Sequence, residues 1–237
     1  MMHTVLLATV PRTGTRLIGQ FFKNMPEITH DINLHDLAKN PAMFQSPFGS
    51  GLIPSGGNLV VGHFDRPNIS HIQLLSQFWR PVTTLKDPLF TMLSMHERTK
   101  PENCKETDTE PDPHQKNGDP LFMPTMWNSF MWAVNAVKPF CICVDLLDTT
   151  EERVYALSKA CEAAGISLDV DYIEKFAKEW PPTNTLGSYP LKDAYLAGDM
   201  EAIEAELPRE VAILRAMEPQ LRPMLEVLGY ENLMWWS

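Results

Sequence analysis

The stretch VLLATVPRTGTRLIGQFF, residues 5–22, decides how the rest of the sequence is interpreted. An apolar run leads into a turn of small residues, and an amphipathic pattern follows the turn. The run over residues 4–10 is mostly Val and Leu, which is typical of a strand buried on both faces of a parallel sheet. After the turn, apolar residues recur at helical spacing from Leu17 to Met25. The order strand, small-residue turn, helix is typical of a phosphate-binding loop.

The rest of the chain alternates strand and helix patterns. Strands that alternate with helices imply an α/β fold, in which a parallel sheet lies between two layers of helices and the ligand binds beyond the carboxyl ends of the strands. The further expected strands are residues 58–63, 81–86 and 139–147, and the expected helices are residues 71–79, a segment from Pro88, 150–164, 168–179 and 199–229.

The length of 237 residues suits one α/β domain, and we expect residues 1–237 to form it. Two polar stretches without helical or strand periodicity interrupt the pattern, at residues 97–121 and 180–198. We expect both to be long loops, of the kind that often cover binding sites.

Charge and composition narrow the possible partners and the compartment. A formal net charge of −10 predicts a surface that repels nucleic acid and anionic membranes. The longest apolar stretch, residues 130–144, is interrupted by Asn135, Lys138 and Pro139, so we expect no membrane span. The first ten residues lack a basic segment and a cleavage site, and we interpret them as a strand rather than a signal peptide. The four cysteines include no C-x-x-C pair, which favours reduced thiols and a cytoplasmic location.

The turn after the first strand departs from the loop of nucleotide-hydrolysing proteins, G-x-x-x-x-G-K-[ST]. When Gly14 is aligned with the second glycine, Thr15 takes the place of the lysine and Arg16 that of the metal-binding hydroxyl. The loop therefore lacks the groups that grip a terminal phosphate and Mg²⁺, and we expect no metal site. Successive backbone N–H groups from residue 13 onward and the planar guanidinium of Arg12 still suit one tetrahedral anion.

Two motifs resemble those of sulfotransferases that use 3′-phosphoadenosine 5′-phosphosulfate (PAPS). The sequence PRTGT, Pro11–Thr15, resembles the loop that binds the 5′-phosphosulfate in that family. The family's second signature is Arg-x-Pro followed by a serine eight residues after the arginine, and it binds the 3′-phosphate. The segment KDPLFTMLS has Lys86, Pro88 and Ser94 at that spacing. Lys86 keeps the charge of the family's arginine but loses its bidentate geometry.

The resemblance implies a set of nucleotide-binding residues and a P-loop-like sulfotransferase architecture. It implies that the first motif holds the 5′-phosphosulfate and that Arg12 also stabilises the leaving group. It implies that the second motif holds the 3′-phosphate. The implied cofactor-binding residues are Arg12, Thr13, Gly14, Thr15, Arg16, Lys86 and Ser94.

Sulfuryl transfer to a hydroxyl needs a general base, and His63 is the first candidate. In cytosolic sulfotransferases a catalytic histidine ends the equivalent strand about two dozen residues before the second signature, and Lys86 lies 23 residues after His63. Imidazole also titrates near neutral pH. Other sulfotransferases place a carboxylate base shortly after the first helix. The alternatives from that segment are Asp31, His35 and Asp36, of which Asp31 and His35 are an i, i+4 pair if the segment is helical.

The leading hypothesis is a PAPS-dependent sulfotransferase. It would transfer the sulfuryl group by in-line displacement to a hydroxyl or amine of a small-molecule or saccharide acceptor, with PAP (3′-phosphoadenosine 5′-phosphate) as product and without a metal. Two alternatives stay open. One is a non-catalytic module of the same fold that binds PAP or another anion. The other is a small-molecule kinase, which the missing loop lysine and metal hydroxyl disfavour.

Overall fold

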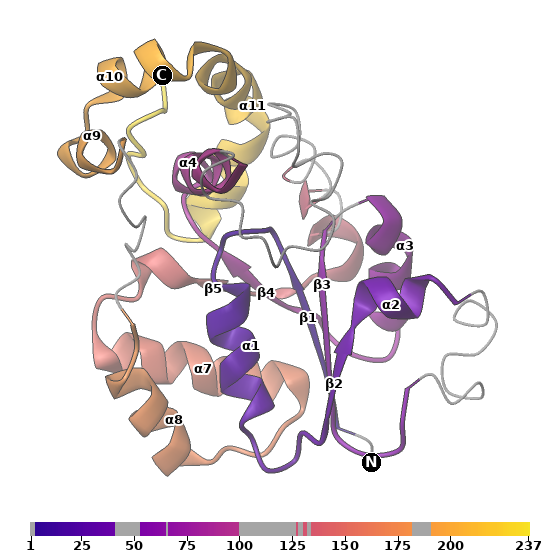
Figure 1. Cartoon of the computed structure of the whole chain (residues 1–237). Helices are drawn as coiled ribbons and strands as arrows, with labels where there is room; N and C mark the ends of the chain where they lie inside the picture. Colours follow the sequence, from indigo (N-terminus) through magenta and orange to yellow (C-terminus); the bar gives the residue numbers. More distant parts are fainter. Residues whose placement is uncertain are drawn as a thin grey trace.

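The computed structural model is a layered α/β structure with a parallel sheet between helices (Figure 1). It describes residues 3–40, 53–64, 66–99, 127, 130–131, 134–181 and 191–237, and all structural statements refer to these. Within them, five strands form one sheet in the order β2-β3-β1-β4-β5, and every pairing is parallel. The strands are β1 (Thr4–Thr9), β2 (His30–Asn33), β3 (Asn58–His63), β4 (Val82–Leu85) and β5 (Phe140–Cys143).

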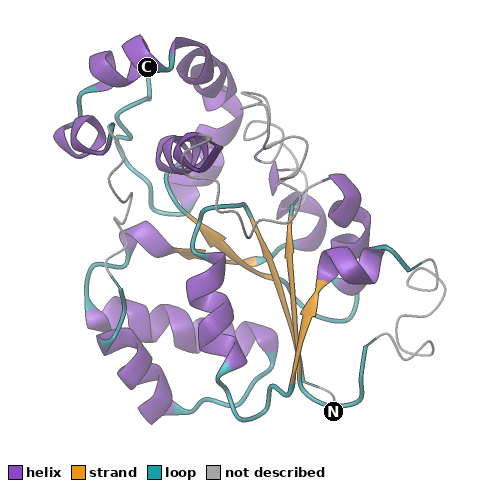
Figure 2. Cartoon of the chain, in the orientation of Figure 1, coloured by secondary structure: helices purple, strands orange, loops and turns teal. Residues whose placement is uncertain are grey.

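Helices cover the sheet on both sides, as Figure 2 shows. The expected class, an α/β fold with a parallel sheet flanked by helices, is confirmed. The described helices are α1 (Thr15–Lys23), α2 (Leu34–Ala38), α3 (Arg66–Leu75), α4 (Pro88–Thr99), the 3₁₀ turn η3 (Val144–Leu146), α7 (Thr150–Ala164), α8 (Val170–Lys178), α9 (Lys192–Ala197), α10 (Met200–Glu206) and α11 (Pro208–Val227).

The central strand β1 separates two hydrophobic cores. Every residue of β1 is buried, as its unbroken apolar run predicts for a strand with neighbours on both faces. Val5 and Leu7 pack with α1, α7 and α8 on one face. Leu6 and Ala8 pack with α2, α3, α4 and α11 on the other. The connection between β1 and α1 therefore lies at the carboxyl edge of the sheet, between β3 and β4.

One strand was not expected from the sequence. Residues 30–33 form β2 at the edge of the sheet, where they pair with β3, so the helical interpretation of that segment is wrong for Asp31. His30 and Ile32 are partly buried and alternate with the exposed Asp31 and Asn33. A four-residue edge strand with polar side chains on one face carries no apolar run by which to recognise it.

Other expected boundaries also change. The helix expected from residue 71 begins at Arg66, the strand expected over 139–147 ends at Cys143 and continues as η3, and the helix expected over 199–229 is broken at Leu207 into α10 and α11. Each change moves an end or a break, and none moves the motifs. The expected loop 180–198 contains α9, with residues 182–190 outside the described residues. The expected loop 97–121 begins inside α4, and residues 100–121 also lie outside the described residues.

Two further observations bear on the surroundings of the chain. Among the described residues, no helix is both long enough and apolar enough to cross a membrane. The described cysteines Cys141, Cys143 and Cys161 form no disulfide, and burial raises the pKa of each thiol to about 12. They are therefore protonated at neutral pH.

Candidate functional site

The turn between β1 and α1 has a backbone that only particular residues can adopt. Arg12 has φ 68° and Gly14 has φ 108°, both in the left-handed region. A Cβ on residue 14 would also lie 3.3 Å from Cγ2 of Val144, so glycine suits this position on two grounds. Gly14 caps α1 and no side chain bonds the helix start, so the first N–H groups of α1 face the carboxyl edge of the sheet.

The buried hydroxyl of Thr13 fixes the turn to the sheet. It donates a 2.6 Å hydrogen bond to the carbonyl of Val10 and shares a 2.8 Å hydrogen bond with the hydroxyl of Thr84 on β4. Thr13 is fully buried, so its side chain anchors the turn and does not face a ligand. Any anion contact at residue 13 therefore comes from its backbone N–H.

The structure brings the two sequence motifs together. Nε of Arg12 donates a 3.0 Å hydrogen bond to Oγ of Ser94, which lies on α4. Arg12 is exposed, whereas Ser94 is 8% exposed, so the guanidinium reaches from the turn across to a recessed hydroxyl. The residues are 82 positions apart in the chain, and the contact forms because β1 and β4 are neighbours in the sheet.

Lys86 adds a second cation to this part of the site. It follows the end of β4, is 7% exposed, and its Nζ lies 4.6 Å from the centre of the Phe90 ring. Burial lowers the pKa of the Lys86 ammonium, the carboxylate of Asp145 opposes that shift, and the charge of Arg12 adds to it. Two positive groups therefore lie close enough to affect one another beside Ser94, which is an arrangement suited to an anion.

A buried carboxylate supports the chain directly after Lys86. Oδ1 of Asp87 accepts 2.8 Å hydrogen bonds from the backbone N–H of Leu89 and from Nε1 of Trp235, and Oδ2 accepts a 2.9 Å bond from the hydroxyl of Tyr195. The first bond is the helix cap expected from the Asp-Pro pair. Burial raises the pKa of Asp87 to about 6 despite these hydrogen bonds.

A second carboxylate lies next to the first. Oδ2 of Asp145 accepts a 2.6 Å hydrogen bond from the backbone N–H of Asp87, and Oδ1 accepts a 2.6 Å bond from the hydroxyl of Tyr230. Burial raises the pKa of Asp145 as well. Together with Trp235, Tyr230 connects the C-terminal segment to the end of β4, so the last residues of the chain hold the backbone around Lys86.

On the other side of the turn, three side chains form a hydrogen-bonded chain. The hydroxyls of Thr9 and Thr15 share a 2.7 Å bond, and Thr9 Oγ1 lies 3.0 Å from Nδ1 of His63. Thr9 and His63 are register partners on the adjacent strands β1 and β3, so both side chains leave the sheet on the same face. The structure thus places His63 one residue away from the start of α1.

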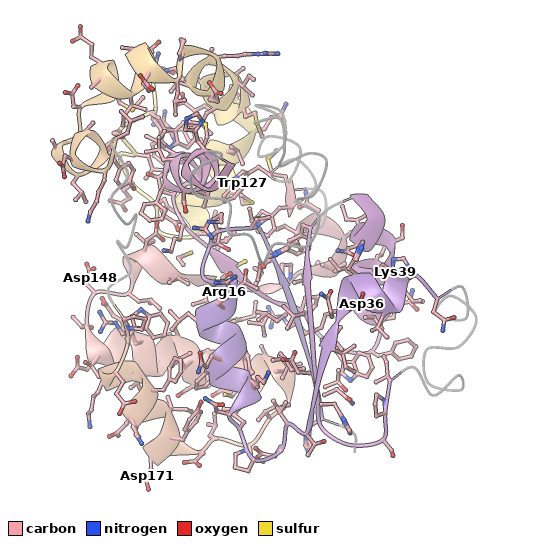
Figure 3. The ribbon with its side chains drawn as sticks, viewed as in Figure 1. Arg16, Asp36, Lys39, Trp127, Asp148 and Asp171 are labelled. Atoms are coloured by element: carbon pink, nitrogen blue, oxygen red, sulfur yellow. The ribbon has the colours of Figure 1, made fainter. Side chains whose placement is uncertain are left out.

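His63 and Thr15 both line a groove of about 740 Å³ between α1 and the strands β2 and β3. Arg16, labelled at the start of α1 in Figure 3, lines the groove too and is exposed. Of the alternative bases, only Asp31 reaches this groove, and its carboxylate forms a 2.7 Å ion pair with Lys23.

The other two alternatives lie on α2, away from the groove lining. Asp36, also labelled in Figure 3, forms a 3.2 Å ion pair with Lys39. The backbone N–H of His35 bonds the side chain of Asn33, which caps α2. Neither side chain is among the described residues that line the groove with His63.

Sequence reasoning did not identify several residues that organise this site. Thr9 occupies the place of a glycine in the nucleotide-hydrolysing loop, and that substitution is the one signal that could have directed attention to it. The roles of Tyr195, Tyr230 and Trp235 depend on contacts with residues 85 to 148 positions away, and no local pattern announces them.

Comparison of the chain with protein-family models, with curated proteins and with solved structures gives no match. The functional argument therefore stands on the geometry described above.

Proposed function

We propose that the protein is a PAPS-dependent sulfotransferase with a P-loop-like sulfotransferase architecture. The observation that carries the proposal is the 3.0 Å hydrogen bond between Arg12 and Ser94, because it unites two motifs that would each hold one end of the same nucleotide. Had these residues been on opposite faces of the sheet, no single nucleotide could touch both.

The residues around the turn fit a nucleotide with two separate phosphate groups. The N–H groups at the start of α1 and the guanidinium of Arg12 would hold the 5′-phosphosulfate, since a helix start and a planar cation both favour a tetrahedral anion. Lys86 and Ser94 would hold the 3′-phosphate. Binding of an anion would also stabilise the charged form of Lys86, whose pKa is lowered chiefly by burial.

His63 would serve as the base for the acceptor. If its Nδ1–H donates to Thr9, its Nε2 takes the proton, and the Thr9 hydroxyl is left to donate to Thr15. PAPS supplies the sulfuryl group: the bond between sulfur and the bridging phosphate oxygen breaks as a bond to the acceptor oxygen forms, and PAP leaves. Arg12 would stabilise the negative charge that grows on the leaving phosphate.

The proposal favours His63 over the alternative bases. The carboxylate of Asp31 is held by Lys23 at 2.7 Å, which favours its charged form but occupies it. His35 and Asp36 lie on α2, outside the groove lining that contains Thr15.

Thermal denaturation in the presence of PAP or AMP tests the nucleotide site. A ligand that binds only the folded state raises the melting temperature. We expect PAP to raise it more than AMP, and Lys86→Ala combined with Ser94→Ala to remove the advantage of PAP. Ser76→Ala combined with Lys178→Ala is the matched control, because both residues lie away from the site. Equal effects of PAP and AMP on the unmodified protein would refute the proposal.

Turnover separates the enzyme from the alternatives. Transfer of labelled sulfate from PAPS to an acceptor panel, lost in His63→Ala, is the result expected of a sulfotransferase. PAP binding without transfer would indicate the non-catalytic module, and turnover of Mg-ATP without PAP binding would indicate the kinase.

A further inference from the structure

The groove beside His63 runs along a part of the sheet that the described helices leave uncovered. Helices α1, α7 and α8 pack on this face over β1, β4 and β5, while the groove lies between α1 and the strands β2 and β3 (Figure 1). One end of the groove is lined by Thr15 and His63, and Lys23 and Asp31 line it farther along. The 2.7 Å ion pair between Lys23 and Asp31 joins α1 to β2 across the groove.

The walls of the groove are rich in neutral hydrogen-bonding groups. Gln20 and Asn24 line it from the side of α1, and Asn33 lines it from β2. All of these amides are exposed, and each offers two N–H donors and a carbonyl acceptor. A ligand that fits them carries several groups able both to donate and to accept, which is the property of a molecule with many hydroxyls.

The floor of the groove is aliphatic. Leu59 and Val61 of β3 point into it from the sheet, and Leu59 is buried while Val61 is partly exposed. Among the described lining residues there is no Phe, Tyr or Trp. A flat aromatic acceptor would draw its affinity from stacking and from apolar walls, and the described walls offer it little of either.

Charge and size narrow the class further. The two charges away from His63 compensate each other in the Lys23–Asp31 pair, and the remaining cation, Arg16, lies beside the proposed phosphosulfate loop. A volume of about 740 Å³ lies within the range of about 300–1,000 Å³ usual for small-molecule sites. The ion pair across the groove disfavours a long polymer that would extend through it.

We infer that this groove binds the acceptor, and that the acceptor is a small, neutral, polyhydroxylated molecule of the monosaccharide class. The inference rests on the proposed function for its chemistry: an acceptor hydroxyl near Thr15 and His63 would lie between the base and the loop that holds the sulfuryl donor. The amides of Gln20 and Asn33 then determine specificity, and His63 takes the proton.

The experiment titrates methyl β-glucopyranoside, with 2-naphthol as the aromatic competitor, against the PAP-saturated protein. Backbone amide NMR shifts report binding whether or not transfer occurs. We expect the glucoside to shift the amide signals of Gly19, Gln20 and Asn33, and naphthol to leave them unchanged. In a transfer assay with PAPS, Gln20→Leu combined with Asn33→Leu should raise KM for the glucoside at least about tenfold, since two hydrogen bonds are lost. Gln73→Leu is the matched control, because Gln73 is exposed on α3 and does not line the groove.

The outcomes separate this inference from the proposed function. If PAP binds but the glucoside shifts no groove signal, or if naphthol shifts them and the glucoside does not, the acceptor class assigned here is wrong and the nucleotide site stands. If PAP fails to bind, the proposed function falls. Titrating the glucoside without PAP then decides the groove separately, and shifts confined to the groove would still support a polyhydroxylated ligand.

Discussion

The two sides of the turn between β1 and α1 are built from different chemistry. On the side of β4, Arg12 and Lys86 place two cations beside Ser94, with the buried carboxylates of Asp87 and Asp145 behind them. On the side of β3, Thr9, Thr15 and His63 form a chain of neutral hydrogen-bonding groups. The first side is suited to holding charge and the second to moving a proton. The comparison teaches that binding and proton transfer can be disturbed one at a time.

The largest effect is expected on the neutral side. His63→Ala should lower the turnover of PAPS about 10²–10⁴-fold, the usual contribution of a general base, while PAP affinity stays within about twofold. Sulfate transfer and PAP calorimetry on the same preparation measure the two quantities. Asp31→Asn provides the control for the alternative base. Unchanged turnover in His63→Ala, or an equal loss in Asp31→Asn, would contradict the division between the two sides.

The next effect concerns the carboxylates behind the charged side. Because the pKa of Asp87 in the folded protein is raised to about 6 from 3.8, the folded state holds this proton more tightly than the unfolded state. Asp87 therefore lowers the free energy of unfolding as the pH rises from about 4 to above 6, by about 3 kcal/mol in total.

Urea denaturation of the unmodified protein and of Asp87→Asn at pH 4.5 and pH 7.5 measures this dependence. Much of the decline in stability between these pH values should be absent in the variant, whatever its absolute stability. Asp36→Asn, at an exposed position, should keep the decline. A parallel pH dependence in the unmodified protein and Asp87→Asn would show that Asp87 does not titrate in this range.

A smaller effect tests the hydrogen-bonded chain of the neutral side. Thr9→Val keeps the shape of the side chain and removes the hydroxyl that lies 3.0 Å from Nδ1 of His63. Turnover should fall about tenfold, because an unfavourable tautomer and orientation of the imidazole become populated.

Nitrogen-15 NMR of the imidazole supplies a readout that a general loss of structure would not produce. The unmodified protein should show the tautomer with the proton on Nδ1, Thr9→Val should shift the population toward Nε2, and Thr9→Ser should restore it. An unchanged tautomer in Thr9→Val would remove Thr9 from the account.

The smallest effect is that of one neutral hydrogen bond on the charged side. Ser94→Ala should weaken PAP binding up to about tenfold and leave AMP binding unchanged, because only PAP carries the 3′-phosphate. Ser76→Ala, which removes an exposed hydroxyl on the turn after α3, should affect neither ligand. Calorimetric titrations measure both affinities, and equal weakening of PAP and AMP would place Ser94 near the other phosphate.

The sequence predicted the centre of the fold better than its edges. The apolar runs of β1, β3 and β4 are long or bounded by clear turn and cap residues, so these strands were found nearly at their observed bounds. Edge strand β2 escaped because His30–Asn33 alternates and includes exposed polar residues. The break at Leu207 also escaped, since Pro208 at the start of a helix resembles a proline tolerated within a helical pattern.

The candidate site was predicted in outline and missed in its support. Motif spacing assigned Arg12 and Ser94 to one site, and the parallel order of β1 and β4 brings them within hydrogen-bonding distance. The partners of Asp87 could not be predicted, because Trp235 lies 148 residues away and only the packing of the C-terminal segment brings it there. Local patterns specify a loop, whereas the residues that hold it rigid are set by the tertiary fold.

The central claim is that the turn and the start of α4 hold opposite ends of one nucleotide. A crystal structure of the protein with PAP bound tests this most directly. We predict the 5′-phosphate against the N–H groups of residues 13–16 and Arg12, and the 3′-phosphate within hydrogen-bonding distance of Lys86 and Ser94. PAP bound elsewhere, or bound with one phosphate in solvent and Ser94 untouched, would contradict the account.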